Sequence, residues 1–586
     1  MNNFKVFKKN EFHTTIVFII VIQIILSFQG FDVCDDGFAL TFYQQIYNSP
    51  SSVEYNFVYW LSGIIGGVWY SLYQEGGVLW LRFLGVIINT LTFIVSYEAL
   101  KGYISKRKLL IGLLIVLFVN DYGFLTFYHN HITALLAVLS IYFFSKGIKK
   151  TNFILLAIAG FLIGINVFSR IPNITLFVFI LVIPFTWYLR NKIVFKTIFP
   201  PILGIVTGFI VVYITLYSLD QVNIMKNALF SLVSLGETEG SAHNVTSLFY
   251  TYVGNYMKLF FVFFQFLAIS IFVLSIYLFF KKNRLIRMSI STLIFFLMIF
   301  WFKKADIYII YVIGYIGTLG ILFTKQKEGI KVLSFLAFLM MLFLPLGSGG
   351  GIRSSGYMCI WLAVPLFFYF ISQFGNITLT FNIKKEDISR TITKSSIKYL
   401  SMFFLFSYAT GKIYSLSQEA YFDQGSRLNK IYKINNKYAS GVYTTKERAL
   451  IINDLLASLE QYVKPNDYLL TYDKIPMVHF LTETKPYMFN PWIWIYDSYS
   501  FKKNMDRAEK EIDVLPIIVQ QKFETIGTFS EPTLEYLTES IGNDIRYSNG
   551  FDKNRVKIMN SFISRNEYEI VWSNAYFNIY KSDKKR

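Results

Sequence analysis

The most regular pattern along the chain is a series of apolar runs separated by short polar segments. A helix needs about 17–25 apolar residues to cross the hydrocarbon core of a bilayer, and these runs approach that length. Thirteen spans are predicted, at residues 12–30, 78–99, 108–120, 131–146, 152–169, 174–189, 199–218, 258–280, 286–302, 306–323, 331–346, 357–373 and 397–413. The pattern therefore predicts a polytopic α-helical membrane protein.

Lysine and arginine concentrate before the first span and after every even-numbered span, for example at 101–108, 146–150 and 281–287. Short cytoplasmic loops carry such an excess, so these loops and the N-terminus are predicted to be cytoplasmic. An odd number of spans then places the C-terminal part outside the cytoplasm. If spans 9 and 10 were one span, the later topology would reverse, and the basic loop 384–398 would face outward.

The character of the sequence changes at about residue 414, where polar and charged residues replace the long apolar runs. Residues 444–463 have the pattern of an amphipathic helix, and Thr444 and Glu447 have the spacing of a capping box. Residues 467–473 and 515–521 read as short buried strands, and 568–581 reads as a hairpin turning at Ser573 and Asn574. We therefore predict two domains, a membrane domain at 1–413 and an extracytoplasmic α/β domain at 414–586.

Composition agrees with this picture and excludes several classes of protein. The 586 residues are 54% hydrophobic and 16% charged. The formal charge of +19 comes largely from the basic loops, so it does not predict a nucleic-acid partner. Two cysteines, Cys34 and Cys359, allow neither a disulfide framework nor a CxxC metal site.

Candidate chemistry lies on the side of the membrane opposite the basic loops. Three acids, Asp32, Asp35 and Asp36, follow the first span within a few positions. The predicted outer segments are 31–77, 120–130, 219–257 and 347–356. Ionisable residues at or near this outer face also include Asp121, His129, His131, Arg170, His243, Lys303, Lys304 and Arg353. Charges at membrane depth cost about 2.5–3.5 kcal/mol each, so such residues tend to be paired or functional.

Each of these residues also has a plain structural explanation. Asp32 is expected to be a solvated loop residue, and Cys34 to pack as a small apolar side chain. Arg170 at a helix end is able to reach the lipid headgroups, and so are the neighbouring lysines Lys303 and Lys304. The histidines fit an interfacial position equally well. The aromatic stretch 487–499 suits sugar stacking, membrane docking or a buried core.

The functional interpretation combines carboxylates with cations. A carboxylate can take a proton from an attacking hydroxyl or amine, and lysine or arginine can neutralise a phosphate leaving group. Together they predict group transfer from a lipid phosphate at the outer face. Motifs for nucleotide phosphates, serine hydrolysis or zinc proteolysis, namely GxxxxGK[ST], GxSxG and HExxH, do not occur.

Several stretches resemble GT-C glycosyltransferases of the protein O-mannosyltransferase and aminoarabinose-transferase type. "DVCDDGFALTFYQQI" resembles their acidic first outer loop, "NDYGFLTFYHNH" their second acidic loop, and "GFLIGINVFSRIPNITLF" a glycine-rich span ending in arginine. "LRFLGVIINTLTFIVSY" looks like their second span. "YLLTYDKIPMVHFLTETKPY" and "LPIIVQQ" resemble the C-terminal periplasmic domain of bacterial members. This chain departs from the pattern in having Asp-Asp where the family usually has Asp-Glu.

The resemblance implies an inverting transferase of the bacterial inner membrane that uses a polyprenyl-phosphate sugar donor. The acceptor is a lipid, a glycan or a protein. Asp35 would be the general base, Asp36 would position the acceptor or a metal, and Asp121 matches the acid of the second loop. Weaker matches for binding the donor phosphate are Arg170, Lys303, Lys304 and Arg353. A divalent cation stays open, with Glu54, Glu75 and His243 as candidate ligands.

Two other functions are compatible with the same features. A polysaccharide polymerase or O-antigen ligase also joins lipid-linked glycans, but typically relies on a large arginine-rich outer loop, whereas 347–356 is short and has one arginine. A transporter or flippase of lipid-linked glycans would often show related halves, and this chain has no detectable repeat.

Overall fold

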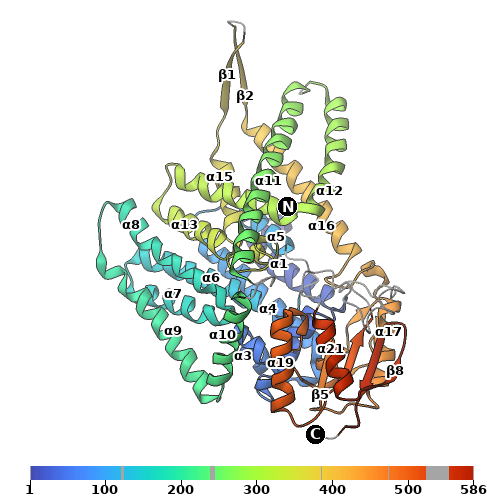
Figure 1. Cartoon of the computed structure of the whole chain (residues 1–586). Coiled ribbons are helices and arrows are strands. Elements are labelled where there is room, and N and C mark those ends of the chain that lie inside the picture. The colour runs from blue at the N-terminus through green and yellow to red at the C-terminus, as the bar shows by residue number, and fades with distance from the viewer. Residues whose placement is uncertain are drawn as a thin grey trace.

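The computed structural model describes residues 2–119, 125–237, 244–280, 282–383, 386–472, 474–522 and 554–584. Helices dominate the first part of the chain (Figure 1). Its elements are α1 (Asn2–Ser27), α2 (Asp35–Gln45), η1 (Pro50–Tyr59), α3 (Trp60–Leu72), η2 (Gln74–Gly76), α4 (Gly77–Leu100), α5 (Lys106–Val119), α6 (His129–Lys150), α7 (Phe153–Asn166), η3 (Val167–Ser169), η4 (Ile171–Leu181), α8 (Val182–Arg190), η5 (Phe195–Thr197), α9 (Phe199–Ser218), α10 (Val222–Glu237), α11 (Val245–Phe279), α12 (Arg284–Phe323), α13 (Glu328–Phe343), α14 (Ile352–Cys359), α15 (Ala363–Gln373), the hairpin β1 (Ile377–Ile383) and β2 (Glu386–Ile392), and α16 (Lys394–Gln418).

Among the described residues, six helices are long and apolar enough to cross a membrane, or seven if the bent pair α14–α15 counts as one span. Three shorter apolar helices, Glu11–Ser27, Phe153–Ser169 and Ile307–Phe323, coincide with other predicted spans. The chain is therefore a multi-pass membrane protein by the length and composition of its helices. The count of thirteen stays a prediction.

The predicted spans 286–302 and 306–323 both lie in α12. Its first part, Arg284–Trp301, lies along α11, where Trp301 Nε1 donates to Gln265 Oε1 at 3.0 Å. Its second part, Ile307–Phe323, lies along α13, where Tyr311 Oη donates to the Met341 carbonyl oxygen at 2.6 Å. Each part has its own neighbours, in keeping with two apolar segments.

Several basic loops meet at one end of the helical part. Arg190 Nη2 donates to the Ile148 carbonyl oxygen at 3.1 Å and pairs with Glu328 at 2.6 Å. Gly329 lies against the Tyr103 hydroxyl. The loops after α4, α6, α8 and α12 thus gather together, as the predicted cytoplasmic face requires. Their membrane orientation stays a prediction.

The helices α7 and α9 approach each other through glycines spaced four apart. A Cβ atom on Gly160 would lie 1.9 Å from the Pro201 carbonyl oxygen, and one on Gly204 would lie 2.0 Å from the Ala157 carbonyl oxygen. Gly164 and Gly208 repeat the contact one turn further on. Such small residues let backbones pack closely where no hydrophobic drive exists between membrane helices.

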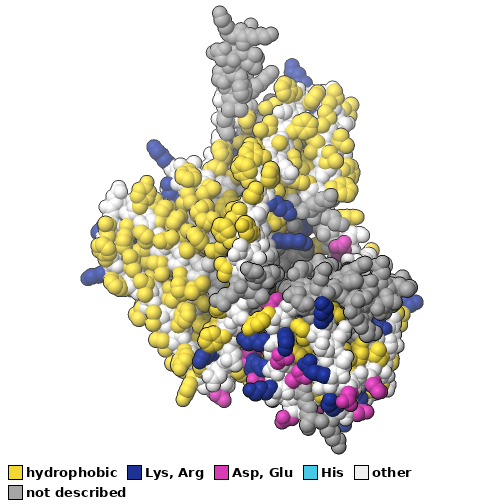
Figure 2. Space-filling model, in the orientation of Figure 1, with side chains coloured by type: hydrophobic (Ala, Val, Ile, Leu, Met, Phe, Trp, Pro, Cys, Tyr) yellow, Lys and Arg dark blue, Asp and Glu magenta, His cyan; other side chains and the backbone are white. Residues whose placement is uncertain are grey.

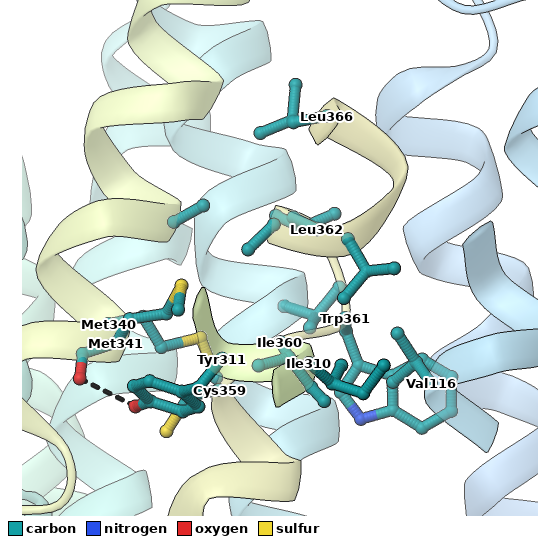
Figure 3. Packing of buried hydrophobic residues seen from close by; sticks show 14 of the residues in the cluster. Val116, Ile310, Tyr311, Met340, Met341, Cys359, Ile360, Trp361, Leu362 and Leu366 are labelled. Carbon is teal, nitrogen blue, oxygen red and sulfur yellow. Dashed lines mark hydrogen bonds between the residues drawn. The ribbon is translucent and has the colours of Figure 1, made fainter. Parts of the chain in front are cut away.

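The centre of the membrane part is an apolar core between α5, α12, α13 and the α14–α15 corner. Figure 3 shows Val116, Ile310, Met340 and Leu362 converging there, all nearly inaccessible. In Figure 2 apolar side chains cover the outer surface of the helices, whereas acidic and basic side chains intermingle on the C-terminal part. This contrast is the one expected between a lipid-facing and a water-facing surface.

The C-terminal part contains a five-stranded mixed sheet in the order β6-β5-β7-β9-β8. Strand β5 pairs in parallel with β6 and β7, and β9 pairs antiparallel with β7 and β8. Its elements are η6 (Arg427–Asn429), β3 (Tyr432–Lys433), η7 (Lys437–Ala439), β4 (Tyr443–Thr444), α17 (Lys446–Leu459), β5 (Tyr468–Tyr472), α18 (Met477–Thr482), β6 (Lys485–Pro486), η8 (Ile493–Ile495), α19 (Ser498–Glu511), β7 (Ile517–Gln521), α21 (Asn554–Arg565), β8 (Glu569–Ser573) and β9 (Phe577–Lys581). The predicted strands, hairpin and helix are all present.

Two details of this region differ from the sequence-based expectation. The capping-box prediction for Thr444 is wrong, because Thr445 caps α17 by accepting from the Arg448 backbone N–H. The Thr444 hydroxyl instead donates to Asp423 Oδ2 at 2.7 Å. The helix α16 also continues to Gln418, a few residues past the predicted boundary at 413.

Candidate functional site

The three acids after α1 have three different environments. Asp32 is almost inaccessible, so the expectation of a solvated loop residue is wrong. Its two carboxylate oxygens accept from the backbone N–H groups of Cys34 at 2.7 Å and Asp36 at 2.9 Å. Because these are free donors in the first turn of α2, Asp32 stabilises the start of that helix.

Asp36 points into the membrane part and forms a buried ion pair. Its Oδ2 lies 3.1 Å from Arg82 Nη2, and both side chains are nearly inaccessible. The Arg82 guanidinium also donates to the carbonyl oxygens of Ser27 and Gly30 and to the Thr126 hydroxyl. Arg82 therefore fixes the end of α1, the following loop and α2 relative to α4.

Asp35 faces away from that ion pair and is partly accessible. The Tyr421 hydroxyl donates to its Oδ2 at 2.6 Å. Burial raises the pKa of Asp35 to about 6, the bond from Tyr421 opposes this, and the charge of Asp36 adds to it. A carboxylate with such a pKa can accept a proton near neutral pH, which suits a general base.

Arg170, between η3 and η4, is a second buried cation near the acids, in addition to Arg82. It is 6% exposed, and its Nη1 has no hydrogen-bond partner among the described residues. A buried polar network holds the backbone on either side of it: Asn173 Nδ2 donates to Thr133 Oγ1 at 2.9 Å and to Ser169 Oγ at 3.1 Å. Burying a guanidinium nitrogen without a partner is costly, so an anionic ligand would stabilise it.

Tyr59 links Arg170 to Asp35. Burial raises the pKa of Tyr59, the charge of Arg170 lowers it, and the charge of Asp35 raises it, so both charges lie within electrostatic reach of one hydroxyl. The Tyr59 ring stacks on the His129 ring with centroids 4.0 Å apart, and the Tyr128 ring packs against the same His129 ring with centroids 3.9 Å apart. The site thus combines a carboxylate and an arginine around a cluster of aromatic side chains.

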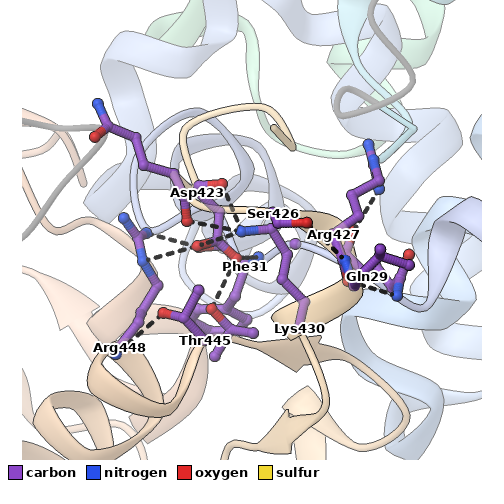
Figure 4. Close-up of polar contacts among 12 residues, drawn as sticks. Gln29, Phe31, Asp423, Ser426, Arg427, Lys430, Thr445 and Arg448 are labelled. Carbon is purple, nitrogen blue, oxygen red and sulfur yellow. Dashed lines mark hydrogen bonds and ion pairs between the residues drawn. The ribbon is translucent and has the colours of Figure 1, made fainter. Parts of the chain in front are cut away.

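The loop that carries the acids is held by the C-terminal part of the chain (Figure 4). The buried Asp423 accepts from the Phe31 backbone N–H at 2.8 Å and pairs with Lys430 and Arg448, each at 3.2 Å. Arg448 Nη1 in turn donates to the Phe31 carbonyl oxygen at 2.8 Å. Residues of the connector after α16 therefore position both the loop and, through Tyr421, the Asp35 carboxylate.

Backbone pairing strengthens this attachment. The N–H of Gly30 donates to the Tyr443 carbonyl oxygen and the N–H of Tyr443 to the Phe28 carbonyl oxygen, both at 2.8 Å. The N–H of Met477 donates to the Val33 carbonyl oxygen at 3.0 Å. Residues 28–33, which we call the acid loop, therefore pair with the C-terminal part almost as a strand does.

Other predicted residues lie elsewhere. Arg353 is exposed on α14 and interacts with Tyr308, whose ring lies 4.3 Å from Lys258 Nζ; no described contact joins it to Asp35. Asp121 and His243 lie outside the described residues, and so do the side chains of Lys303 and Lys304.

Of the candidate metal ligands, the two that the structure describes, Glu54 and Glu75, lie in different environments. Both carboxylate oxygens of Glu54 are occupied, by Arg507 at 2.6 and 3.1 Å and by Asn227 at 3.0 Å. Glu75 is exposed on η2. Within the described part of the chain, no three His, Cys, Asp or Glu side chains are grouped to hold a metal ion.

The aromatic stretch 487–499 is mainly core. Tyr487, Trp492 and Tyr496 are buried. Trp492 packs edge-on against Phe38 of α2 with centroids 5.9 Å apart, and Tyr496 packs edge-on against Tyr55 at 5.8 Å. These contacts attach the C-terminal sheet to the elements that follow the acids.

Comparisons with known proteins identify no close relative. No protein-family model matches the chain, and no curated protein matches it. Among solved structures, the chain is similar to ArnT from Cupriavidus metallidurans bound to undecaprenyl phosphate. That similarity covers 97% of this chain and 98% of the other, with 11% sequence identity and a TM-score of 0.36. At these values the likeness does not by itself assign a fold or an activity.

Three residues of the site were not anticipated from the sequence. Arg82 had a usable signal, because a lone arginine inside an apolar span is costly unless it has a partner. Tyr59 and Tyr421 had none, since tyrosine is common throughout the chain, with 41 copies. Only the fold brings the Tyr421 hydroxyl into contact with Asp35 and the Tyr59 hydroxyl within reach of its charge.

Proposed function

We propose that this protein is an integral-membrane glycosyltransferase that moves a sugar from a polyprenyl-phosphate donor to a lipid, glycan or protein acceptor. The observation that supports this most is that the charges of Asp35 and Arg170 both act on the buried Tyr59 hydroxyl. Asp35 is a partly accessible carboxylate with a pKa of about 6, and Arg170 is a buried guanidinium whose Nη1 has no hydrogen-bond partner among the described residues. The motif resemblance points to the same chemistry.

The reaction follows from these two groups. Asp35 takes the proton of the acceptor hydroxyl or amine, whose freed electron pair attacks the anomeric carbon of the donor. The bond from that carbon to the phosphate oxygen breaks, and its electron pair leaves with the polyprenyl phosphate. Arg170 binds the phosphate and neutralises its growing charge. Attack from the side opposite the leaving group inverts the anomeric configuration.

Asp36 acts differently from the role that its position in the acidic pair implies. With Arg82 as its partner it holds α2 in place, and its charge raises the pKa of Asp35. The described residues offer no ligand set for a divalent cation, so the mechanism assigns no step to one. We place the reaction at the outer face of a bacterial inner membrane, on the side opposite the basic loops.

The proposal is tested by reconstituting the purified protein in liposomes with polyprenyl-phosphate sugars extracted from the producing cells. We expect Asp35→Asn to lower the rate of transfer by about 10²–10⁴-fold, the usual contribution of a general base. Asp220→Asn is the matched control, because Asp220 is exposed in a predicted outer loop and its φ of 54° suits asparagine.

Full transfer by Asp35→Asn at normal expression would refute the proposal. Movement of the lipid-linked sugar across the bilayer without any covalent product would show a transporter instead. Mass spectrometry of envelope glycans from a deletion strain would identify the sugar by its loss.

A further inference from the structure

A cavity that neither Asp35 nor Arg170 lines lies between α10 of the membrane part and α19 of the C-terminal part. Its volume is about 340 Å³, within the range of about 300–1,000 Å³ that ligand pockets occupy. We call it the α10–α19 cleft. It is lined by Glu54, Asn227, Phe230, Ser231, Ser234, Tyr496, Ser500, Lys503, Asn504, Arg507 and Glu511.

The lining comes from two helix faces that oppose each other. The residues of α10 lie at positions 227, 230, 231 and 234, and those of α19 at 500, 503, 504, 507 and 511. Both sets follow the spacing of one helical face. Five of the nine side chains on these faces are hydroxyls or amides, and Tyr496 also lines the cleft. Asn227, Ser500 and Asn504 each donate one hydrogen bond within the protein, and their oxygens leave further neutral acceptor sites toward the cleft.

Charges in the cleft compensate one another. Arg507 pairs with Glu54 at 2.6 Å and with Glu511 at 2.9 Å, and its guanidinium lies 4.0 Å from the ring centroid of Phe489. Of the four charged side chains in the lining, Lys503 is the one without an ion pair among the described residues. A phosphate or another polyanion would meet little net positive charge here.

The cleft also suits neither a lipid chain nor an extended peptide. The lining holds four charged side chains and two amides, whose remaining acceptor and donor sites an acyl chain would desolvate without replacing their hydrogen bonds to water. An extended peptide binds most readily at an exposed strand edge, and the walls here are helices. A neutral polyol would instead find donors, acceptors and an aromatic face, which together recognise sugar rings.

The helix η1 connects the cleft with the candidate base. Glu54 at the cleft and Tyr59, on whose hydroxyl the charge of Asp35 acts, both belong to η1. Five residues of a 3₁₀ helix span about 10 Å at a rise of about 2 Å each. That separation is one that a di- or trisaccharide bridges.

We propose that the α10–α19 cleft binds a neutral oligosaccharide, and that this oligosaccharide is part of the acceptor. Its role as acceptor rests on the proposed glycosyltransferase function. Its binding does not, because the cleft contains neither Asp35 nor Arg170.

The test measures binding by titration calorimetry to the full-length protein in nanodiscs. The probes are maltotriose, chitotriose and mannotriose, with inorganic phosphate and trialanine as the anionic and peptide alternatives. We expect at least one trisaccharide to bind. Ser231→Phe, which fills the cleft, and Asn504→Leu, which removes an amide, should each weaken that binding about tenfold or more. Lys502→Ala should leave it unchanged, since Lys502 is exposed, pairs with Asp506 and is not part of the lining.

The proposal is overturned if none of the three trisaccharides binds, if phosphate or the peptide binds in their place, or if both cleft variants bind the sugar as the wild type does. Asp35→Asn separates the two hypotheses. It should bind the trisaccharide with the affinity of the wild type. If this variant keeps full transfer activity, the transferase proposal fails but the binding proposal stands. If no trisaccharide binds, the binding proposal fails but the transferase proposal stands.

Discussion

Asp35 and Asp36 are neighbours in sequence but have opposite surroundings. Successive residues of a helix point about 100° apart, since a turn contains 3.6 residues. In α2 this sends Asp36 toward Arg82 and Asp35 toward Tyr421. A charge that already has a buried partner is poorly suited to accept a proton, whereas a partly accessible carboxylate with one hydrogen bond is well suited.

Tyr421 should set the pH dependence of the reaction. If Asp35 is the base as proposed, it works when deprotonated, so activity is expected to rise as pH increases through about 6, the pKa of Asp35. The hydrogen bond from Tyr421 lowers that pKa. In Tyr421→Phe the pKa therefore rises, and the acidic limb of the kcat/KM profile should move to higher pH.

The measurement is transfer activity between pH 5 and 9, with Tyr499→Phe as control because Tyr499 is exposed on α19. An unmoved limb, or a limb shifted to lower pH, would show that Tyr421 does not act on Asp35. A uniform loss at every pH would indicate a purely structural role.

At this scale the sequence singles out the acids but does not predict their partners. Three acids after an apolar run stand out by spacing alone. The burial of these acids cannot be predicted from their spacing. Asp32 obtains its partners from the backbone of its own loop, and Asp35 obtains one from residue 421. Contacts so distant in sequence leave no local pattern.

Among the elements, the approach of α2 to α18 depends on Gly37, the residue directly after the acid pair. A Cβ atom there would lie 2.1 Å from the Met477 backbone nitrogen and 2.4 Å from its Cα. Backbone atoms cannot rotate out of the way as a flexible side chain does, so any side chain at 37 separates the two helices.

Gly37→Ala should therefore destabilise the protein. Inserting a methyl group into a well-packed contact costs about 1–3 kcal/mol. We expect a lower midpoint of thermal unfolding in detergent and a loss of activity that follows it. Gly102→Ala is the control, since a Cβ at Gly102 meets nothing within 4 Å. Equal midpoints for the two variants would contradict the described packing of α2 on α18.

Removing the charge of Asp423 should have a larger effect. Its partners Lys430 and Arg448 are buried, and removing one member of a buried ion pair costs about 3–5 kcal/mol because an unpaired charge is left. Asp423→Asn should thus lower the unfolding midpoint and detach Tyr421 from Asp35. Asp506→Asn, in an exposed pair with Lys502, should change the midpoint little. Similar midpoints for both variants would argue against the cluster as an anchor.

Periodicity predicts most of the long helices and the strands of the C-terminal sheet, because apolar runs and alternation are local properties. It does not predict α3, η1 or α10, which lie in segments treated as outer loops. Their faces are shaped by contact with elements far along the chain, such as the packing of Tyr55 against Tyr496. The elements that build the site and the cleft are thus the least visible in the sequence.

For the whole molecule, the gathering of basic loops at one end and of the acids at the other predicts a sidedness that labelling can test. Cys34 and Cys359 are both buried, so the wild-type protein should react little with a membrane-impermeant maleimide. Lys502→Cys should be labelled in cells with a permeabilised outer envelope, and Lys149→Cys only after the inner membrane is opened. Both lysines are exposed. Labelling of Lys149→Cys with the inner membrane intact would contradict the predicted topology and place this loop outside the cytoplasm.

The attachment of the acid loop to the C-terminal part also bears on the order of events during synthesis. Residues 28–36 leave the ribosome early, but their partners Tyr421, Asp423, Tyr443 and Met477 are made hundreds of residues later. Until then α2 has no α18 to pack against and Asp35 lacks its hydroxyl donor. A nascent or prematurely terminated chain could already sit in the membrane and contain both acids, yet it would not have assembled the site. Completion of the last third of the chain therefore serves as the step that switches the carboxylate into its working environment.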